Sequence, residues 1–178
     1  MERPEVPLEQ AQESIAHHAR AAEEKWIMGV ALTAAMLAVL AAITALFAEY
    51  DANEAVILQI EGSNQWAYYQ SKGIKGNLLA TRMEVLTALG KPVTDQDRKK
   101  AEQYREEQDE IRKVAEEKHA EATGHLARHH VLAYSLTMFQ IGIAVAAIAV
   151  LTKRKSFWLA SMGLGIAGVT EILWGLLG

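Results

Sequence analysis

Three long apolar stretches dominate the chain, and a polar stretch separates the first from the second. The apolar stretches cover residues 26–48, 131–152 and 157–177, and Glu171 is their only charged residue. About 20 consecutive apolar residues form a helix of roughly 30 Å, which equals the thickness of the hydrocarbon core of a bilayer. The pattern therefore predicts an integral membrane protein with three transmembrane helices.

The polar stretch, residues 49–130, is rich in helix-forming residues and is interrupted at one place. Gly90 suits a helix C-terminus, Pro92 cannot continue a helix, and Thr94 with Asp97 resembles a capping box. We therefore expect an all-α fold in which two long helices form an antiparallel, coiled-coil-like hairpin. Its turn is expected near residues 90–94.

Each arm of the expected hairpin has only a thin row of apolar residues at spacings of three, four and seven. Many of these positions are Gly or Ala, so two such helices bury little apolar area. Further copies of the chain would complete the core, and we therefore expect a homo-oligomer.

An aromatic and basic block, QWAYYQSKGIKGN, occupies the first arm of the expected hairpin. Folding the hairpin symmetrically about Pro92 would place Trp66 and Tyr69 across from Ala115, His119 and Ala122, where large rings that face small residues can fill a narrow interface. The alternative is a platform on which a partner docks. The residues assigned to packing or docking are Trp66, Tyr68, Tyr69, Lys72 and Lys75.

The same block, with an acidic helix after it and apolar stretches on both sides, resembles the bacterial family catalogued as domain of unknown function 4337. The resemblance covers most of residues 20–178, and the sequence GSNQ before the tryptophan is a minor departure from it. The likeness implies the same membrane placement and brings no assigned activity. It rests on Trp66, Tyr68, Tyr69, Gln70, Lys72 and Ile74.

The short loop between the second and third apolar stretches contains three consecutive cations, in the sequence KRKS. Cations in short loops concentrate on the cytoplasmic side of a membrane. We therefore expect a multi-pass protein of the bacterial inner membrane with a cytoplasmic, polar or amphipathic N-terminal helix over residues 1–25. The hairpin and the C-terminus would then be periplasmic, although basic residues before the second stretch act against this orientation.

Glu171 is the sharpest candidate for a functional residue. An ionisable group near the middle of a membrane costs at least ~2.5 kcal/mol unless it is paired or hydrated. Two roles stay open, which are a proton or cation site in an oligomeric pore and a hydrogen-bonded clasp to Thr33, Thr44, Ser135 or Thr137. Small residues around Glu171 and in the first stretch permit close helix contact. The residues assigned to such contact are Ala31, Ala35, Ala38, Ala42, Gly163, Ala167 and Gly175.

Acidic and histidine residues at the base of the expected hairpin form further candidate sites. Glu49, Asp51 and Glu54 follow the first apolar stretch and could form the mouth of a cation pathway. His125 and His129 are four residues apart and share a helix face, a spacing compatible with two ligands on one metal. The candidate metal ligands are His125, His129, Glu54 and Glu61, and ordinary hydrogen bonding of these histidines is the alternative.

Composition excludes several classes of function. The chain has no cysteine, which excludes disulfides and thiolate metal sites. Its net charge is −4 without a basic stripe, which argues against nucleic acid as a partner. No catalytic motif or phosphate-binding glycine loop is apparent, so we expect neither an enzyme nor a cofactor.

These observations favour a structural or accessory membrane protein whose partners are the lipid bilayer, further copies of itself and other subunits of a membrane complex. One alternative is a small oligomeric cation channel or transporter that uses Glu171 and the acidic mouth. Another follows from layout alone, since the order of spans and hairpin resembles the three-span core of a family of membrane insertases. The coiled coil of those insertases is cytosolic, so an expected periplasmic hairpin places this alternative last.

Overall fold

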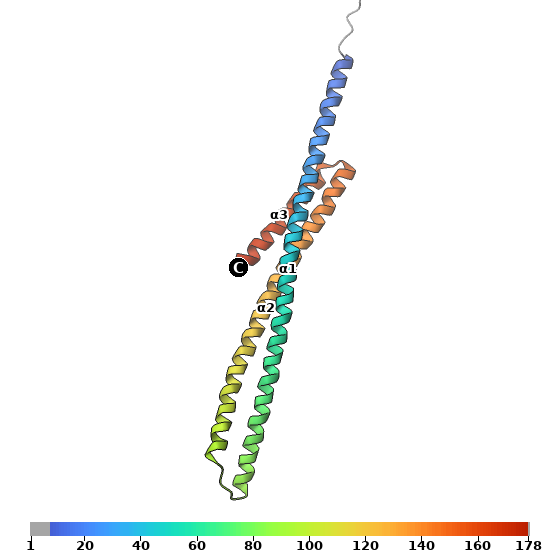
Figure 1. Ribbon diagram of the computed structural model, residues 1–178. Helices are drawn as coiled ribbons and strands as arrows, with labels where there is room; N and C mark the ends of the chain where they lie inside the picture. Colours follow the sequence, from blue (N-terminus) through green and yellow to red (C-terminus); the bar gives the residue numbers. More distant parts are fainter. Residues whose placement is uncertain (1–7, 178) are drawn as a thin grey trace, which may run out of the picture. The chain divides into compact units, whose positions relative to one another are not determined.

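The chain is helical apart from short connections at residues 89–94 and 153–154 in the part that its computed structural model describes, which is residues 8–177 for the backbone and 25–175 for the side chains (Figure 1). Its helices are α1 (Leu8–Ala88), α2 (Asp95–Thr152) and α3 (Lys155–Leu177), and no strand occurs among the described residues. The predicted all-α class is therefore confirmed. The amphipathic side chains expected before residue 25 lie outside the described side chains.

The chain divides into two compact units. The apolar unit contains the chain up to Ala48 and from His130 onward, and the polar unit contains Glu49–His129. Each of the three helices contains a segment long and apolar enough to cross a membrane. This finding rests on length and composition, and it agrees with the three apolar stretches identified in the sequence.

The backbone at residues 89–94 explains why α1 stops. Gly90 has a φ of 68°, a left-handed conformation that glycine adopts without steric cost. The Lys91 N–H donates to the Leu86 carbonyl at 2.8 Å, which satisfies one of the carbonyl groups that the last helical turn leaves free. Pro92 then prevents the helix from resuming.

A side-chain cap starts α2. The Asp97 backbone N–H donates to Thr94 Oγ1 at 3.2 Å, and the Thr94 hydroxyl donates to the Asp97 carboxylate at 2.7 Å. Asp95 and Asp97 in the first turn also interact favourably with the helix dipole. The capping residues that the sequence suggested therefore make the contacts that define this helix end.

In the apolar unit, all three helices contribute to a small core. Val30 packs with Ala146 and Ala149, and Leu37 and Ala41 pack with Phe139, which is completely buried. The indole N–H of Trp158 donates to Thr33 Oγ1 at 3.0 Å, which links α3 to α1.

Two glycines allow α3 to approach this core. A Cβ on Gly168 would lie 2.6 Å from Cε1 of Phe139, and one on Gly165 would lie 2.7 Å from Cδ2 of Leu37. Both separations are shorter than real Cβ contacts, so only glycine fits without a shift of its neighbour. The inward side of α3 is therefore set by Gly165 and Gly168.

Large apolar side chains cover the outside of the apolar unit. Leu151 is 84% exposed and Trp174 is 83% exposed in the single chain. Water-soluble monomers rarely expose extended apolar surfaces of this kind. A hydrocarbon environment or further protein would cover them.

In the polar unit, the α1 and α2 segments lie side by side (Figure 1), and side-chain pairs join them from Asp51 to Arg82. Small buried residues lie between them, and a Cβ on Gly62 would make an ordinary van der Waals contact, at 3.6 Å, with the Ala115 carbonyl oxygen. The side-chain pairs between the two helices follow opposite orders, because a partner later in α1 pairs with a partner earlier in α2. These pairs are Asp51 with His125, Glu61 with Lys118, Lys72 with Glu107, and Arg82 with Asp97.

The pairing of residues differs from the one expected for a symmetrical fold about Pro92. Trp66 and Tyr69 were expected across from residues 115–122, yet the Tyr69 backbone carbonyl accepts a hydrogen bond from Gln108 at 3.3 Å. That expectation is wrong because residues 91–94 are not helical and advance further per residue than a helix does. They run back past the last turns of α1, so that Asp97 already reaches Arg82, 3.8 Å away.

Candidate functional site

Lys72 is the centre of the polar contacts made by the aromatic block. Its ammonium group donates to the Glu107 carboxylate on α2. It also lies 5.2 Å from the centre of the Tyr68 ring and 5.5 Å from the centre of the Tyr104 ring. Both distances fall within the range of cation–π attraction. The lysine is therefore held by one carboxylate and two aromatic rings from both helices.

The other aromatic residues of the block divide between contact and exposure. The Trp66 and Tyr69 rings meet edge to face, with centres 5.4 Å apart. Trp66 is 37% exposed and Tyr68 is 48% exposed, and Lys75 is also exposed. Among the residues assigned to packing or docking, Tyr69 and Lys72 thus contact α2, whereas the others leave an aromatic and basic surface open.

Ion pairing between the two helices shifts the pKa values of three groups. The hydrogen bond to Glu107 raises the pKa of Lys72 above 10.5. Hydrogen bonds from Lys72 and then Gln103 lower the pKa of Glu107 below 4.5. Glu61, 3.1 Å from the ammonium group of Lys118, raises the pKa of that lysine in the same way. The charged forms of these groups are therefore favoured in the folded chain.

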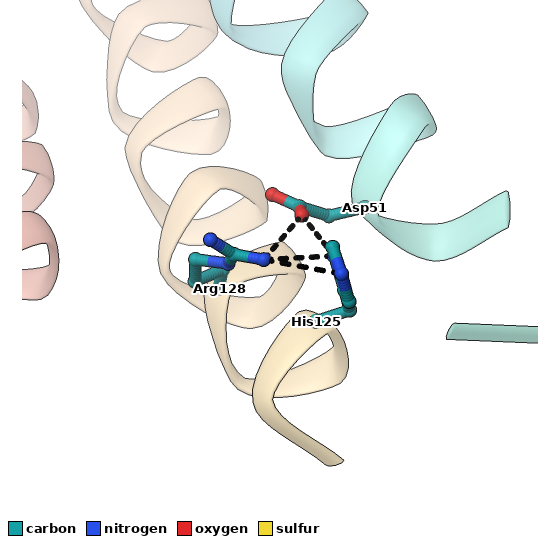
Figure 2. Close-up of polar contacts among 3 residues, drawn as sticks. All are labelled: Asp51, His125 and Arg128. Carbon is teal, nitrogen blue, oxygen red and sulfur yellow. Dashed lines mark hydrogen bonds and ion pairs between the residues drawn. The ribbon is translucent and has the colours of Figure 1, made fainter. Parts of the chain in front are cut away.

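A second polar cluster joins Asp51 on α1 to His125 and Arg128 on α2 (Figure 2). His125 Nδ1 lies 2.7 Å from Asp51 Oδ1, and Arg128 Nη2 lies 3.4 Å from the same oxygen. Arg128 Nη2 also lies 2.9 Å from Nδ1 and 3.3 Å from Nε2 of His125. In the tautomer that carries its proton on Nδ1, His125 can donate to Asp51 and accept from Arg128 at Nε2.

In this cluster, opposite charges on α1 and α2 balance each other where the two helices meet. Asp51 is only 8% exposed, and an unpaired carboxylate at that depth would lose much of its hydration. Arg128 supplies the opposite charge, and His125 supplies a donor. Of the residues expected at a cation mouth, Asp51 is thus engaged by other side chains, Glu54 is half-buried and Glu49 is exposed.

The suggested metal ligands are not gathered into a cluster. Glu61 pairs with Lys118, and His125 pairs with Asp51. Among the described side chains, no three His, Cys, Asp or Glu residues form a group that could hold a metal ion. The metal site stays a prediction that rests on the spacing of His125 and His129.

Glu171 lies on the exposed side of α3, together with Gly163 and Ala167. No hydrogen bond or ion pair joins its carboxylate to any other described residue. Several side chains expected in a clasp bond elsewhere, because Thr33 accepts from Trp158 and Ser135 donates to the Val131 carbonyl at 3.0 Å. Within one chain, therefore, the described residues form no clasp to Glu171.

Most of the small residues assigned to helix contact also lie on the outside of a single chain. Ala31, Ala35, Ala38 and Ala42 are exposed, and Gly163 has open space around it. Gly175 is different, because a Cβ there would lie 2.4 Å from Cγ1 of Val131. The exposed small residues are available to contact another molecule.

Sequence reasoning missed Arg128, Glu107 and Gly168 as important positions. Arg128 follows His125 by three residues, a helical spacing that could have indicated a shared partner. Gly165 and Gly168 have the same spacing and could have marked the inward side of α3. No local signal identifies Glu107 as the partner of Lys72, because that pairing depends on how two distant helix segments align.

Comparison with known proteins gives one family and no annotated relative. The family model described as Domain of unknown function (DUF4337) matches residues 26–178. No curated protein and no solved structure matches the chain.

The Asp51 cluster should stabilise the polar unit. Asp51→Asn removes the carboxylate charge that balances Arg128 while it keeps the shape of the side chain, and it should lower the free energy of unfolding by about 1–3 kcal/mol. Thermal unfolding followed by circular dichroism in mild detergent measures this change. Glu54→Gln is the matched control, because no hydrogen bond or ion pair joins Glu54 to another described residue. Equal unfolding temperatures for both variants would contradict the prediction.

The Lys72–Glu107 pair should make stability depend on pH at both extremes. The lowered pKa of Glu107 stabilises the fold above 4.5, and this contribution is lost as the pH falls through the folded-state pKa. The raised pKa of Lys72 stabilises the fold below 10.5, and this contribution is lost as the pH rises through its folded-state pKa. The difference in unfolding temperature between the wild type and Lys72→Met should therefore be largest near neutral pH. A difference that stays constant into strong acid would show that the pair does not contribute.

Proposed function

This chain belongs to the DUF4337 family, and from that premise we propose that it is a non-enzymatic membrane scaffold that associates with copies of itself and holds other membrane proteins. Its apolar unit would be an anchor of three transmembrane helices in the bacterial inner membrane. Its polar unit would be an antiparallel helical hairpin outside the membrane. Neither unit needs a cofactor for this role.

The observation that carries this proposal is the row of cross-helix ion pairs along the polar unit. Four such pairs, from Asp51 with Arg128 to Arg82 with Asp97, tie the helices at successive levels. Exposed ion pairs contribute little individually, but a row of them disfavours sliding of one helix against the other. The α1 segment over residues 49–88 is about 60 Å long at 1.5 Å per residue. A stiff arm of this length is suited to holding partners at a fixed distance from a membrane.

Self-association is supported by Glu171. Its side chain is exposed on an apolar helix and has no partner among the described residues of its own chain. In contact with lipid it would cost at least ~2.5 kcal/mol, and a second copy can remove that cost by a hydrogen bond between chains. Gly163 and Ala167 on the same side of α3 leave room for a closely packed helix.

The same observation favours a second candidate function. A ring of Glu171 side chains around the axis of an oligomer would form a site for cations or protons within the membrane. The protein would then be a small cation channel. Flux measurements distinguish this function from a scaffold.

The proposed orientation places the hairpin in the periplasm, the N-terminus and the loop between α2 and α3 in the cytoplasm, and the C-terminus in the periplasm. Because the chain has no cysteine, Asp95→Cys introduces a single reactive thiol at the start of α2. A membrane-impermeant thiol reagent should label it in cells whose outer membrane alone is permeabilised. Labelling that requires a permeabilised inner membrane would contradict this orientation and favour an insertase-like arrangement.

The scaffold function predicts an oligomer without conductance. Native mass spectrometry in mild detergent should show several copies for the wild type and fewer for Glu171→Leu, because leucine cannot form a hydrogen bond between chains. Thr170→Leu, at the neighbouring exposed position, should leave the number of copies in the oligomer unchanged. A monomeric wild type would contradict self-association. If the wild type conducts cations into liposomes and Glu171→Gln abolishes this flux, the scaffold function is contradicted and the channel function is favoured.

A further inference from the structure

A second row of apolar residues follows α1 through the polar unit, and the described chain does not cover it. Its large members, Ile57, Ile60, Ile74, Leu78 and Val85, are between 50% and 71% exposed. They occur at alternating spacings of three and four residues when the small or polar residues between them are included. Those residues are Asn64, Ala67, Ser71 and Thr81.

The same spacing continues through the sequence of the apolar unit. Leu32, Met36, Val39, Ile43 and Leu46 occupy the row there and are between 49% and 67% exposed. Tyr50 and Asn53 connect the two parts of the row in the sequence. No charged residue occupies any row position between Leu32 and Ala88. This uncharged heptad repeat is the pattern of a coiled-coil seam.

The row is distinct from the side of α1 that contacts α2. The residues that face α2 in the polar unit include Asp51, Ala55, Leu58 and Gly62, all of which are buried. Each residue turns the helix by about 100°, so the side of α1 that faces α2 and the side that carries the exposed row lie roughly 150° apart around the helix axis. Thus α2 of the same chain cannot cover both sides, and another helix is required.

The chemistry of the row favours a second copy of this chain over other occupants. Lipid can cover apolar residues within a membrane, but it cannot cover the part of the row in the polar unit. A partner helix must carry a matching heptad repeat, and in α2 only Val114 and Leu126 are large, apolar and exposed within the polar unit. The α1 helix of another copy matches the row at every position. Copies anchored in one membrane with the same orientation also have parallel α1 helices.

We propose that α1 helices of two copies pair through this row as a parallel, in-register coiled coil. This inference rests on the proposed self-association and adds to it the interface, the direction of the helices and their alignment. The contact is separate from that of Glu171, which lies on α3.

Asn64 provides the alignment. In the heptad of the exposed row it occupies an a position, together with Ile57 and Leu78. Its amide has no hydrogen bond to another described residue, so it is free to pair with Asn64 of the second copy. A polar asparagine at an a position fixes register and favours two strands at some cost in stability, because any shift would bury the amide against an apolar residue.

Single cysteines test the interface in the full-length protein, which has none of its own. Ile57→Cys, Ile60→Cys and Ile74→Cys should each form disulfide-linked dimers when membranes containing the protein are oxidised. Gln59→Cys and Val114→Cys are matched controls, since both positions are exposed in the polar unit but lie outside the row. The dimer band should be absent or strongly reduced for both controls.

The outcomes separate this inference from the proposed function. An oligomeric mass with no dimer at the row positions, or with equal dimer at the controls, would overturn the α1 interface and leave self-association intact. A monomeric mass would overturn both. Efficient linkage between Ile57→Cys in one copy and Val85→Cys in another would show antiparallel helices and would also overturn the inference.

Substitution of Asn64 tests the alignment independently of folding, because the residue is exposed in a single chain. Asn64→Val should retain or strengthen the dimer but lose its single register. Disulfides should then appear between copies that carry cysteines at row positions one heptad apart, such as Ile60→Cys in one copy and Ala67→Cys in the other. Retention of linkage only between identical positions in Asn64→Val would contradict the role of Asn64.

Discussion

Small side chains at alternating spacings along α1 are the constraint on which the structure of both units depends. Ala41, Thr44 and Ala48 are buried in the apolar unit, and Ala55 and Gly62 are buried in the polar unit. Their size lets helix backbones approach closely, and a Cβ on Gly62 would lie 3.6 Å from the Ala115 carbonyl oxygen. Long side chains at the edges can then reach across to α2. The ion pairs of the polar unit are therefore a consequence of close helix packing.

Charges in the polar unit contribute specificity as well as stability. Removing one partner from a buried pair leaves the other without compensation, so an alignment that satisfies Asp51 is strongly preferred over one that does not. The pairs at Lys72 and Lys118 are more exposed, and their individual contributions are smaller. Together these contacts select one alignment between helices whose narrow apolar seam would tolerate several. That selection supports the proposed role of the polar unit as a stiff arm.

The surfaces that a single chain leaves uncovered support the proposed assembly. Glu171 occupies the outside of α3, and the uncharged heptad row occupies the outside of α1. Contact with lipid would be unfavourable for the carboxyl group of Glu171. Exposure to water would be unfavourable for the isoleucine and leucine residues of the row in the polar unit. Both penalties are relieved if copies of the chain associate. They involve different helices, so the two contacts can exist in one oligomer.

The sequence by itself determined the helical class, the family and the three apolar stretches, because hydrophobicity and helix-breaking residues act locally. Gly90 and Pro92 end a helix wherever the chain goes afterwards. Only the tertiary structure decided that Asp51 meets His125 and Arg128, that Lys72 meets Glu107, and that Gly165 and Gly168 face inward while Ala31 and Ala35 face outward. A helix with small residues on several sides has no local preference for one of them. The choice depends on how distant segments align, and non-helical loop residues shift that alignment by an amount that sequence spacing does not reveal.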